Sequence, residues 1–277
     1  IGSPADTSTE STLSIDLTQL RKEVGWHYLG ERDSSNWSSD ELAQIDEIIN
    51  SGLRQFYHPT PVMGARLSHK WSFMEPTTTL TTVAGTDTYQ LSANFGGMIG
   101  IMTYASTDNR WFPIELTGEH RIRILKQRDY GTVQSDPKLY AIRPKTSDGS
   151  NGQRFELMLY PTPDTAYTLS YRYHALPGKL TTGNPYPLGG EAHAETILES
   201  CLAISESRID NNAGIHNAAF QQRLAASVSY DKVLQSPEYL GYNADRSDGR
   251  AISEAENRAM NGDIVKYNGN YYTDVNP

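Results

Sequence analysis

Hydrophobic residues recur at helical spacing near both ends of the chain, and short apolar runs alternate with polar residues in its middle. The first predicted helix is capped by Asp16 and is apolar on one side. The second begins with Ser38 and Glu41, which have the spacing of a capping box, and must end before Pro59. Their apolar faces comprise Leu17, Leu20, Val24 and Tyr28, and Leu42, Ile45, Ile49, Leu53 and Phe56. Each helix must therefore pack one side against another element.

Helical spacing returns after Pro187 in two further predicted helices. The first ends near Asn211, and the second stops at Pro237. Their apolar faces comprise Ile197, Leu198, Cys201, Leu202, Ser205 and Ile209, and Phe220, Leu224, Val228 and Leu234. Because the apolar faces of the two helix pairs can cover each other, we predict one discontinuous antiparallel helical bundle formed by residues 16–62 and 188–236.

Between the helix pairs, residues 63–187 are predicted to form an inserted antiparallel β domain. Short β-rich runs in this segment are separated by Gly, Pro, Asp and Asn. Seven strands are predicted, at residues 78–83, 88–91, 98–104, 111–116, 139–143, 154–160 and 167–174. Strands of this length and spacing favour a β-sandwich or small barrel over a parallel sheet, so the predicted fold class is α+β.

Three local features of this segment give specific expectations. Trp71 and Phe73 alternate with polar neighbours, which is typical of a strand that enters the β domain. The turn residues 84–87 predict a hairpin between the first two strands. Thr117 is the predicted cap of a helix over residues 119–127. The inward side chains of that helix are predicted to be Ile122 and Leu125.

The two ends of the chain lie outside these predicted domains. Residues 1–15 are rich in Ser, Thr and Asp and are expected to form a flexible arm. Residues 237–277 form a predicted extended tail with little apolar mass, which either stays mobile or orders against a partner. Within this tail, residues 268–270 predict a turn between strand-like pieces at 264–267 and 271–274.

Composition and charge narrow the classes of function. A chain of 277 residues with 37% hydrophobic residues can form one or two domains with a buried core. No stretch approaches the roughly 20 apolar residues that cross a bilayer, so no membrane span is expected. The net charge of −9 disfavours a protein that wraps DNA with Lys and Arg. The excess of 17 Tyr over 6 Phe favours exposed strands and wet interfaces over a buried enzyme core.

The sequence contains none of the common motifs for catalysis or cofactor binding. It has no phosphate-binding loop, dinucleotide fingerprint, HExxH motif or nucleophile elbow. Cys201, the single cysteine, lies on a predicted apolar helix face and is expected to be a core residue. Glu195 and Glu199 are four residues apart and are explained as charges on a solvated helix face. We therefore expect no enzymatic activity, no cofactor and no metal.

Several short runs in a particular order resemble a known family. The order of the chain is helix pair, β insertion, helix pair and tail. The runs that carry the resemblance are Asp46–Ile49 and Leu53–Phe56, then Trp71-Ser72-Phe73, Leu80–Leu91, Leu157–Pro161 and Tyr171–Leu176. Over residues 16–237 this layout resembles the phage head–tail adaptor proteins, also called connector or neck proteins, which include the tail tubular protein A and head-completion proteins.

The resemblance implies a structural role in a virion. Members of the family form a ring, usually of twelve copies, beneath the portal protein of a DNA-filled capsid. Such a ring extends the channel for double-stranded DNA and docks the next neck or tail protein. The implied partners are thus further copies of the chain, the portal, a downstream neck or tail protein and DNA in transit, with no membrane. The implied location is the virion neck, after assembly in the host cytoplasm.

Two sets of residues are candidates for these roles. An acidic channel wall would repel phosphate and let the duplex slide. The candidate channel-facing carboxylates are Asp40, Glu41 and Glu47, or Glu195 and Glu199. The tail is the candidate portal-docking arm, because Tyr provides large contact area with few torsions to restrict. The tyrosines in question are Tyr239, Tyr242, Tyr267, Tyr271 and Tyr272.

Two other classes of function remain open at this point. The chain can be another neck or tail component, such as a stopper, tail-completion or baseplate protein. Alternatively, the aromatic residues of the β domain could form a carbohydrate platform or belong to a hydrolytic module. A ring of fixed copy number would favour the adaptor, whereas a cleft lined by two carboxylates would favour the hydrolase.

Overall fold

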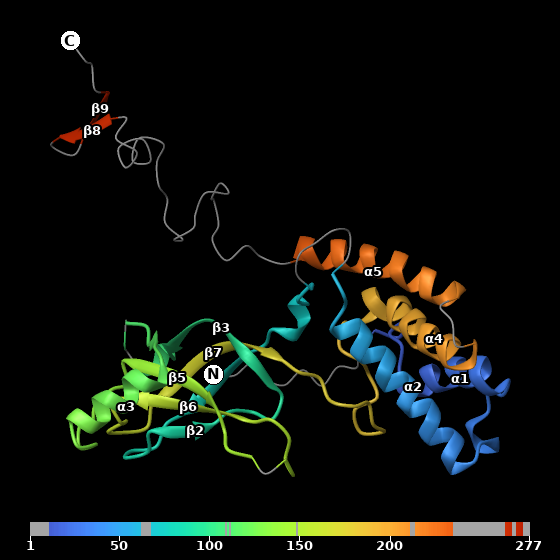
Figure 1. Cartoon of the computed structure of the whole chain (residues 1–277), viewed down its shortest axis with the longest axis horizontal. Helices are drawn as coiled ribbons and strands as arrows, with labels where there is room; N and C mark the ends of the chain where they lie inside the picture. Colours follow the sequence, from blue (N-terminus) through green and yellow to red (C-terminus); the bar gives the residue numbers. More distant parts are fainter. Residues whose placement is uncertain are drawn as a thin grey trace. The chain divides into compact units, whose positions relative to one another are not determined.

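The computed structural model describes residues 11–61, 68–108, 110, 112–147, 149–210, 214–234, 264–267 and 270–273. The chain divides into two compact units, residues 1–232 and residues 233–277. In the first unit, helices come from both ends of the sequence and strands come from its middle, as the colours of Figure 1 show. The protein is therefore of mixed α+β class, as predicted. None of the helices in the described ranges is both long enough and apolar enough to cross a membrane.

Four long helices form what we call the helical region. They are α1 (Leu17–Leu29), α2 (Ser39–Tyr57), α4 (Ala194–Asp210) and α5 (Ile215–Leu234). Asp16 caps α1 by accepting a hydrogen bond from the Gln19 backbone N–H, with an N–O distance of 2.7 Å. Ser38 and Glu41 form both hydrogen bonds of a capping box at the start of α2. The caps are local, so these helix starts agree with the prediction.

The four helices share one hydrophobic core. α4 contacts both α1 and α2. The core side chains come from all four helices and include Leu20, Val24, Ile45, Ile49, Phe56, Ile197, Cys201, Phe220 and Leu224. The backbones of α2 and α4 come close at Gly52, where an added Cβ would lie 2.7 Å from the Cα atom of Cys201. Ser200 Oγ donates a hydrogen bond to the Gly52 carbonyl at 2.8 Å, which fixes this crossing.

Two residues that were predicted to face the core do not. The Leu234 side chain is 57% exposed and that of Ile209 is 43% exposed. Both follow the last buried residue of their helix, which is Asp231 in α5 and Ser205 in α4. Helical spacing continues past the end of the core, so the pattern alone overestimates how far the core extends.

Trp71 belongs to the helical core and not to a strand, contrary to the prediction. Residues Ser72–Met74 form a short 3-10 helix. Trp71 is fully buried and donates a hydrogen bond from Nε1 to the Phe56 carbonyl at 3.0 Å. Its ring lies 4.6 Å from the ring of Phe56 and 5.1 Å from that of His193, measured between centroids. The alternating pattern here reflects burial against helices, which a period of two cannot distinguish from burial in a sheet.

Seven strands and one helix form what we call the β region. The first sheet has the order β1-β7-β3, and the second has the order β2-β6-β5-β4. The strands are β1 (Thr77–Thr81), β2 (Thr88–Gln90), β3 (Phe95–Tyr104), β4 (Glu115–Leu116), β5 (Leu139–Pro144), β6 (Phe155–Tyr160) and β7 (Thr168–Ala175). One hydrophobic core takes side chains from both sheets. The described strands form no closed barrel.

The pairing of the strands differs from the prediction in two respects. β4 pairs with β5 in parallel, so the second sheet is mixed and not purely antiparallel. β1 and β2 do not form a hairpin, because β1 pairs with β7 and β2 pairs with β6. The Tyr89 hydroxyl closes the connection between them by donating to the Thr86 carbonyl at 2.7 Å and accepting from the Val83 N–H at 2.9 Å. A side chain thus holds this turn in place of a backbone ladder.

Helix α3 (Glu119–Arg128) packs on strands β5 and β6 of the second sheet. Its N-cap is Gly118, which provides no side-chain hydrogen bond, so the predicted cap at Thr117 is wrong. The Thr117 backbone N–H instead donates to the Tyr140 carbonyl at 2.8 Å, which extends the edge of the sheet by one bond. Ile122 is fully buried, as predicted, and Leu125 is half-buried.

Several tyrosines of the helical region and the β region are buried, although the composition favoured exposed strands. A tyrosine can bury its ring and still place its hydroxyl on a polar partner at the margin of the core. Tyr104, for example, donates to the Pro137 carbonyl at 2.6 Å. The tyrosines that are at most 7% exposed are Tyr57, Tyr104, Tyr140, Tyr167, Tyr171 and Tyr173. Much of the Tyr-rich composition therefore contributes to the cores.

In the second unit, the described residues form a hairpin. β8 (Ile264–Tyr267) pairs in antiparallel fashion with β9 (Asn270–Thr273). β8 and β9 lie where the strand-like pieces at 264–267 and 271–274 were predicted, whereas two residues of the predicted turn, 268 and 269, lie outside the described residues. The flexible arm predicted at residues 1–15 lies largely outside the described residues.

Candidate functional site

The candidate channel-facing carboxylates of α2 lie in its N-terminal half. Asp40 and Glu47 are exposed, and neither has an ion-pair partner among the described residues. Glu41 instead accepts hydrogen bonds from the Ser38 backbone N–H at 2.7 Å and from Ser38 Oγ at 2.8 Å. The Ser38 backbone hydrogen bond lowers the pKa of Glu41. Two of the three predicted carboxylates therefore remain available to a partner.

The candidate carboxylates of α4 are engaged with α5. Glu199 Oε2 lies 2.9 Å from Nδ1 of His216, and Glu199 Oε1 lies 3.9 Å from Nε of Arg223. Glu195, whose side chain is 68% exposed, lies 3.7 Å from Arg223. Glu206 accepts hydrogen bonds from the backbone N–H groups of Ile215 and His216 at 2.9 and 3.0 Å. These carboxylates thus connect α4 to α5. Glu206 in addition accepts from two backbone N–H groups at the N-terminus of α5 that have no acceptor within the helix.

Of the candidate portal-docking tyrosines, three lie in the hairpin of the second unit. Tyr267 is the last residue of β8, and Tyr271 and Tyr272 lie in β9. Tyr239 and Tyr242 lie outside the described residues. The hairpin brings Tyr267 and Tyr271 to opposite strands next to the turn.

A buried polar cluster joins α5 to the segment before the β region. Asp231 is 1% exposed, and its carboxylate accepts from Ser72 Oγ at 2.5 Å and from the Ser72 backbone N–H at 3.1 Å. Nε2 of His69 lies 2.7 Å from the same carboxylate. The sequence analysis missed this cluster. A signal was present, because Asp231 follows Leu224 and Val228 at helical spacing on the apolar face of α5.

The chemistry of this cluster does not match a catalytic triad. The Ser72 hydroxyl donates to the carboxylate and not to an imidazole, so no base activates it as a nucleophile. His193 lies in the same area, and burial lowers its pKa, which keeps it neutral. The cluster is therefore better explained as a structural connection between distant segments.

Cys201 and the potential metal ligands are the other groups that bear on catalysis or metal binding. Burial raises the pKa of the Cys201 thiol to about 12, so the thiolate that nucleophilic chemistry needs is not formed near neutral pH. Within the described ranges, no three His, Cys, Asp or Glu side chains are grouped so that they could hold a metal ion.

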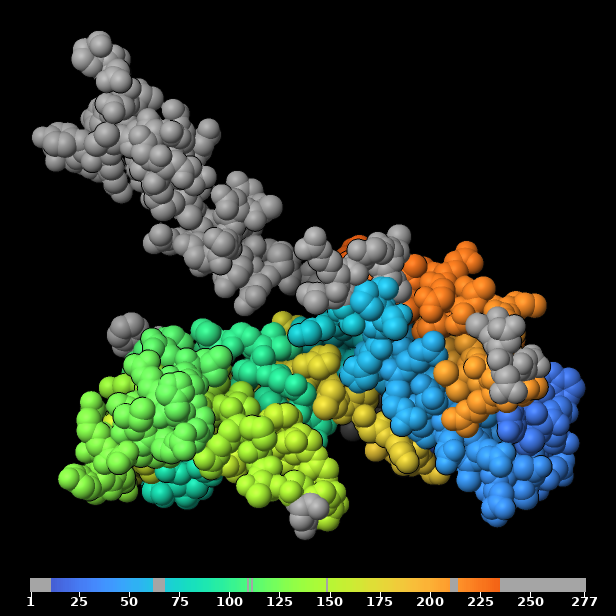
Figure 2. Space-filling model, viewed as in Figure 1, coloured from blue at the N-terminus to red at the C-terminus, as the bar shows by residue number. Residues whose placement is uncertain are grey.

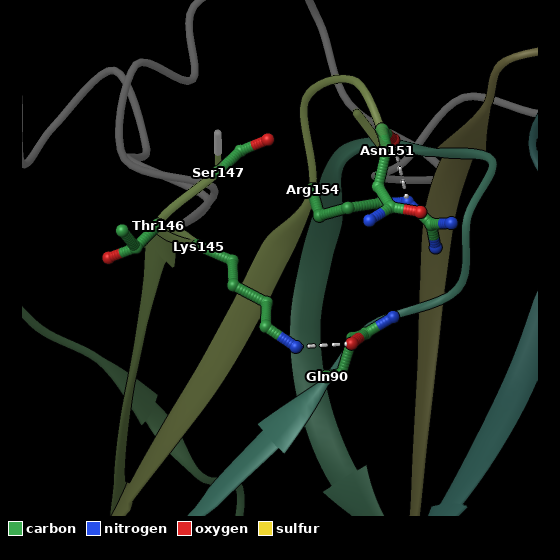
Figure 3. Close-up of a pocket in the computed structure, with 6 residues that line it drawn as sticks. All are labelled: Gln90, Lys145, Thr146, Ser147, Asn151 and Arg154. Carbon is green, nitrogen blue, oxygen red and sulfur yellow. Dashed lines mark hydrogen bonds between the residues drawn. The ribbon is translucent and has the colours of Figure 1, made fainter. Parts of the chain in front are cut away.

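An open pocket lies beside the loop between β5 and β6. It has a volume of about 510 Å³ and is lined by Gln90, Lys145, Thr146, Ser147, Asn151 and Arg154. Figure 3 shows the Lys145 ammonium group donating to the amide oxygen of Gln90, a contact of 2.6 Å. The described side chains that line the pocket are basic or neutral, so none of them supplies a carboxylate of the kind that a glycoside hydrolase uses.

Comparison with known proteins gives the family. No curated protein matches the chain. The model of the SU10 adaptor protein family matches residues 15–244, a range that starts just before α1, contains the whole β region and ends after α5. The match covers nearly the same range as the resemblance found in the sequence, residues 16–237. We conclude that the chain belongs to the SU10 adaptor protein family, which confirms the resemblance to phage head–tail adaptors.

Proposed function

We propose that this protein is the adaptor of a phage neck and forms a ring of twelve copies beneath the portal protein. The family match over residues 15–244 is the observation that carries the proposal. In this role the ring extends the channel through which double-stranded DNA is packaged and ejected, and its lower face docks the next neck or tail protein. Assembly takes place in the host cytoplasm, and the protein then resides in the virion neck.

The proposed architecture consists of two domains and two arms. A helical bundle (residues 16–62 and 188–236) carries an inserted β-sandwich domain (residues 63–187). Two observations support this division: the helices and the two sheets have separate hydrophobic cores, and residues from both sheets contribute to the second core. A ring requires two different contact patches on each copy, and two domains of different chemistry can supply them.

The proposed channel wall is acidic. The net charge of −9 supports this, since a wall that repels phosphate does not hold the duplex by counterion release. The candidate wall residues are Asp40, Glu41 and Glu47 of α2, or Glu195 and Glu199 of α4. Glu41, Glu195 and Glu199 have partners within the chain, so Asp40 and Glu47 would contribute most of the free negative charge.

The proposed anchor to the portal is the C-terminal arm, residues 237–277. Its hairpin β8–β9 could add to the edge of a portal sheet or fill a portal groove. The tyrosines Tyr239, Tyr242, Tyr267, Tyr271 and Tyr272 would supply the contact area. An arm that orders on binding loses about 1–2 kcal/mol of backbone entropy per residue, so it needs many contacts. Repetition around a ring provides avidity for the whole assembly.

Purified portal rings provide the test. We expect the full chain to bind them at a fixed copy number, measured by native mass spectrometry or cryo-electron microscopy. A chain truncated after Ser236 should remain folded and soluble but should no longer bind portal. Normal docking of the truncated chain would show that the arm is not the anchor. Binding to a tail protein but never to portal would instead favour a stopper or tail-completion role.

A further inference from the structure

Helix α3 presents an unusual face to solvent. Arg121, Ile124 and Arg128 have the spacing i, i+3 and i+7, which places them on one side of the helix. Ile124 is 60% exposed, and the side chain of Arg128 is 70% exposed. The opposite side of α3 carries the buried Ile122, which packs with Ala141 and Met158. Figure 2 shows the green segment that contains α3 on the molecular surface. The outward face of α3 thus has an apolar centre between two cations.

Helix α2 presents a face with the same spacing and the opposite charge. Asp40, Ala43 and Glu47 also stand at i, i+3 and i+7, and all three are exposed. Neither carboxylate has an ion-pair partner among the described residues, and the same holds for Arg121, whereas Nε of Arg128 lies 3.3 Å from Oδ1 of Asp129. The small side chain of Ala43 leaves room for a larger apolar group between the two acids. The α2 face therefore complements the α3 face in charge, spacing and size.

The charges of the whole chain are divided in the same way. Residues 16–62 and 188–236 contain 14 Asp and Glu against 7 Lys and Arg, whereas residues 63–187 contain 13 Lys and Arg against 10 Asp and Glu. The acidic α2 face thus lies in a helical region that is acidic as a whole, and the basic α3 face lies in a β region that is mildly basic as a whole. Opposite patches of this kind steer two copies into one register and disfavour contacts between like regions.

We infer that the α3 face (Arg121, Ile124 and Arg128) of one copy docks on the α2 face (Asp40, Ala43 and Glu47) of a neighbouring copy. The inference rests on the proposed ring and names its contact between subunits. It is a heterologous contact, because each copy uses a different patch toward each of its two neighbours, as closure of a ring requires. Ile124 occupies the centre, where burial of apolar surface excludes water, and the charged pairs form the rim.

The apolar centre also favours a protein partner over DNA. A phosphate backbone attracts cations but offers no apolar group to cover Ile124. The inference has a consequence for the channel: if α2 faces a neighbour, Asp40 and Glu47 do not line the lumen, and Glu195 of α4 becomes the leading candidate for the wall.

Binding of the full chain to purified portal rings tests the contact. Contacts between neighbours make ring filling cooperative, so native mass spectrometry should find wild-type rings either empty or full. The pair R121E/R128E should lower the apparent affinity by at least about tenfold and give a statistical distribution of occupancies. The pair D40K/E47K should do the same. Combining all four changes in one chain should restore cooperative filling, because the charges are exchanged and the register is kept.

Matched controls separate this contact from a general effect of charge. The pair K138E/K179E changes two exposed basic residues of residues 63–187 that are not part of α3 and should fill rings as the wild type does. Thermal unfolding should show only small losses, since all the changed side chains are exposed; D40K and R128E each remove a charge that stabilises a helix end, at a cost of about 0.3–1 kcal/mol.

Three results would overturn the inference. The first is cooperative filling by R121E/R128E, and the second is failure of the four-fold exchange to restore filling. The third is normal assembly of D40K/E47K combined with slowed DNA passage, which would assign α2 to the lumen. In all three, wild-type rings still form and the proposed function stands. A wild-type chain that never binds portal would contradict the proposed function and this inference with it.

Discussion

The helical region and the β region bury their cores by different means. Segments far apart in sequence meet in the helical region, where single contacts such as Gly52 against Cys201 and Asp231 with Ser72 fix their positions. In the β region, backbone ladders join the segments, and tyrosine hydroxyls at the core margin bond to nearby backbone groups. A helix satisfies its own backbone, so its position depends on side chains, whereas a strand is positioned by its neighbours. Single substitutions should therefore cost more in the helical region.

The largest effect is expected at Trp71. Trp71→Ala removes a fully buried ring and the hydrogen bond to the Phe56 carbonyl, and should lower the free energy of unfolding by about 3–5 kcal/mol. Urea unfolding followed by circular dichroism measures this change. Trp26→Ala is the matched control, because Trp26 is 54% exposed and loses only surface contacts such as that with Arg32. Equal effects at the two positions would contradict the assignment of Trp71 to the helical core.

The next largest effect is expected at Asp231. Asp231→Ala leaves the Ser72 hydroxyl and backbone N–H without their buried acceptor, which should cost about 3 kcal/mol of stability. Asp231→Asn keeps one acceptor oxygen and should cost less. The same unfolding measurement ranks the three proteins. If the alanine variant is as stable as the wild type, the polar cluster does not join α5 to the segment before the β region.

The close crossing of α2 and α4 predicts a reversal of the usual helix preference. Alanine is favoured over glycine within helices by about 1 kcal/mol, yet Gly52→Ala should destabilise the protein by about 1–3 kcal/mol, since its Cβ would meet the Cys201 backbone. The reverse exchange at an exposed position of the same helix, Ala43→Gly, should cost only the helix preference. Stabilisation by Gly52→Ala would mean that the two helices are further apart.

The smallest effects are expected in the β region, where two tyrosines make a matched pair. Tyr104→Phe loses the hydrogen bond to the Pro137 carbonyl and should cost about 1 kcal/mol. The buried Tyr140 hydroxyl has no hydrogen-bond partner among the described residues, so Tyr140→Phe should be neutral or stabilising. Thermal unfolding of both variants distinguishes them. A large loss of stability in either variant would contradict the expectation that single substitutions cost less in the β region than in the helical region.

The positions of the candidate carboxylates could be predicted from the sequence, but their hydrogen-bond and ion-pair partners could not. The positions of Asp40, Glu47 and Glu195 on exposed helix faces follow from helical spacing. The engagement of Glu199 by His216 and Arg223 does not, since it depends on how α5 packs against α4. The sequence pattern places Asp231 on the apolar face of α5. Its partners Ser72 and His69 lie about 160 residues earlier in the chain, so no local pattern predicts these contacts.

Local patterns in the sequence predict the four long helices and the strands of the β region, although the strand predicted at 111–116 is reduced to the two residues of β4, Glu115–Leu116. Capping, helical spacing and turn residues act within a few positions, so their effects are visible locally. Which strands pair, and which core contains Trp71, depends on the packing of the whole chain. The separation of β1 and β2 into two sheets, and the parallel pairing of β4 with β5, depend on partners supplied by distant segments. Local patterns specify an element and its buried side, but the packing of the whole chain selects what covers that side.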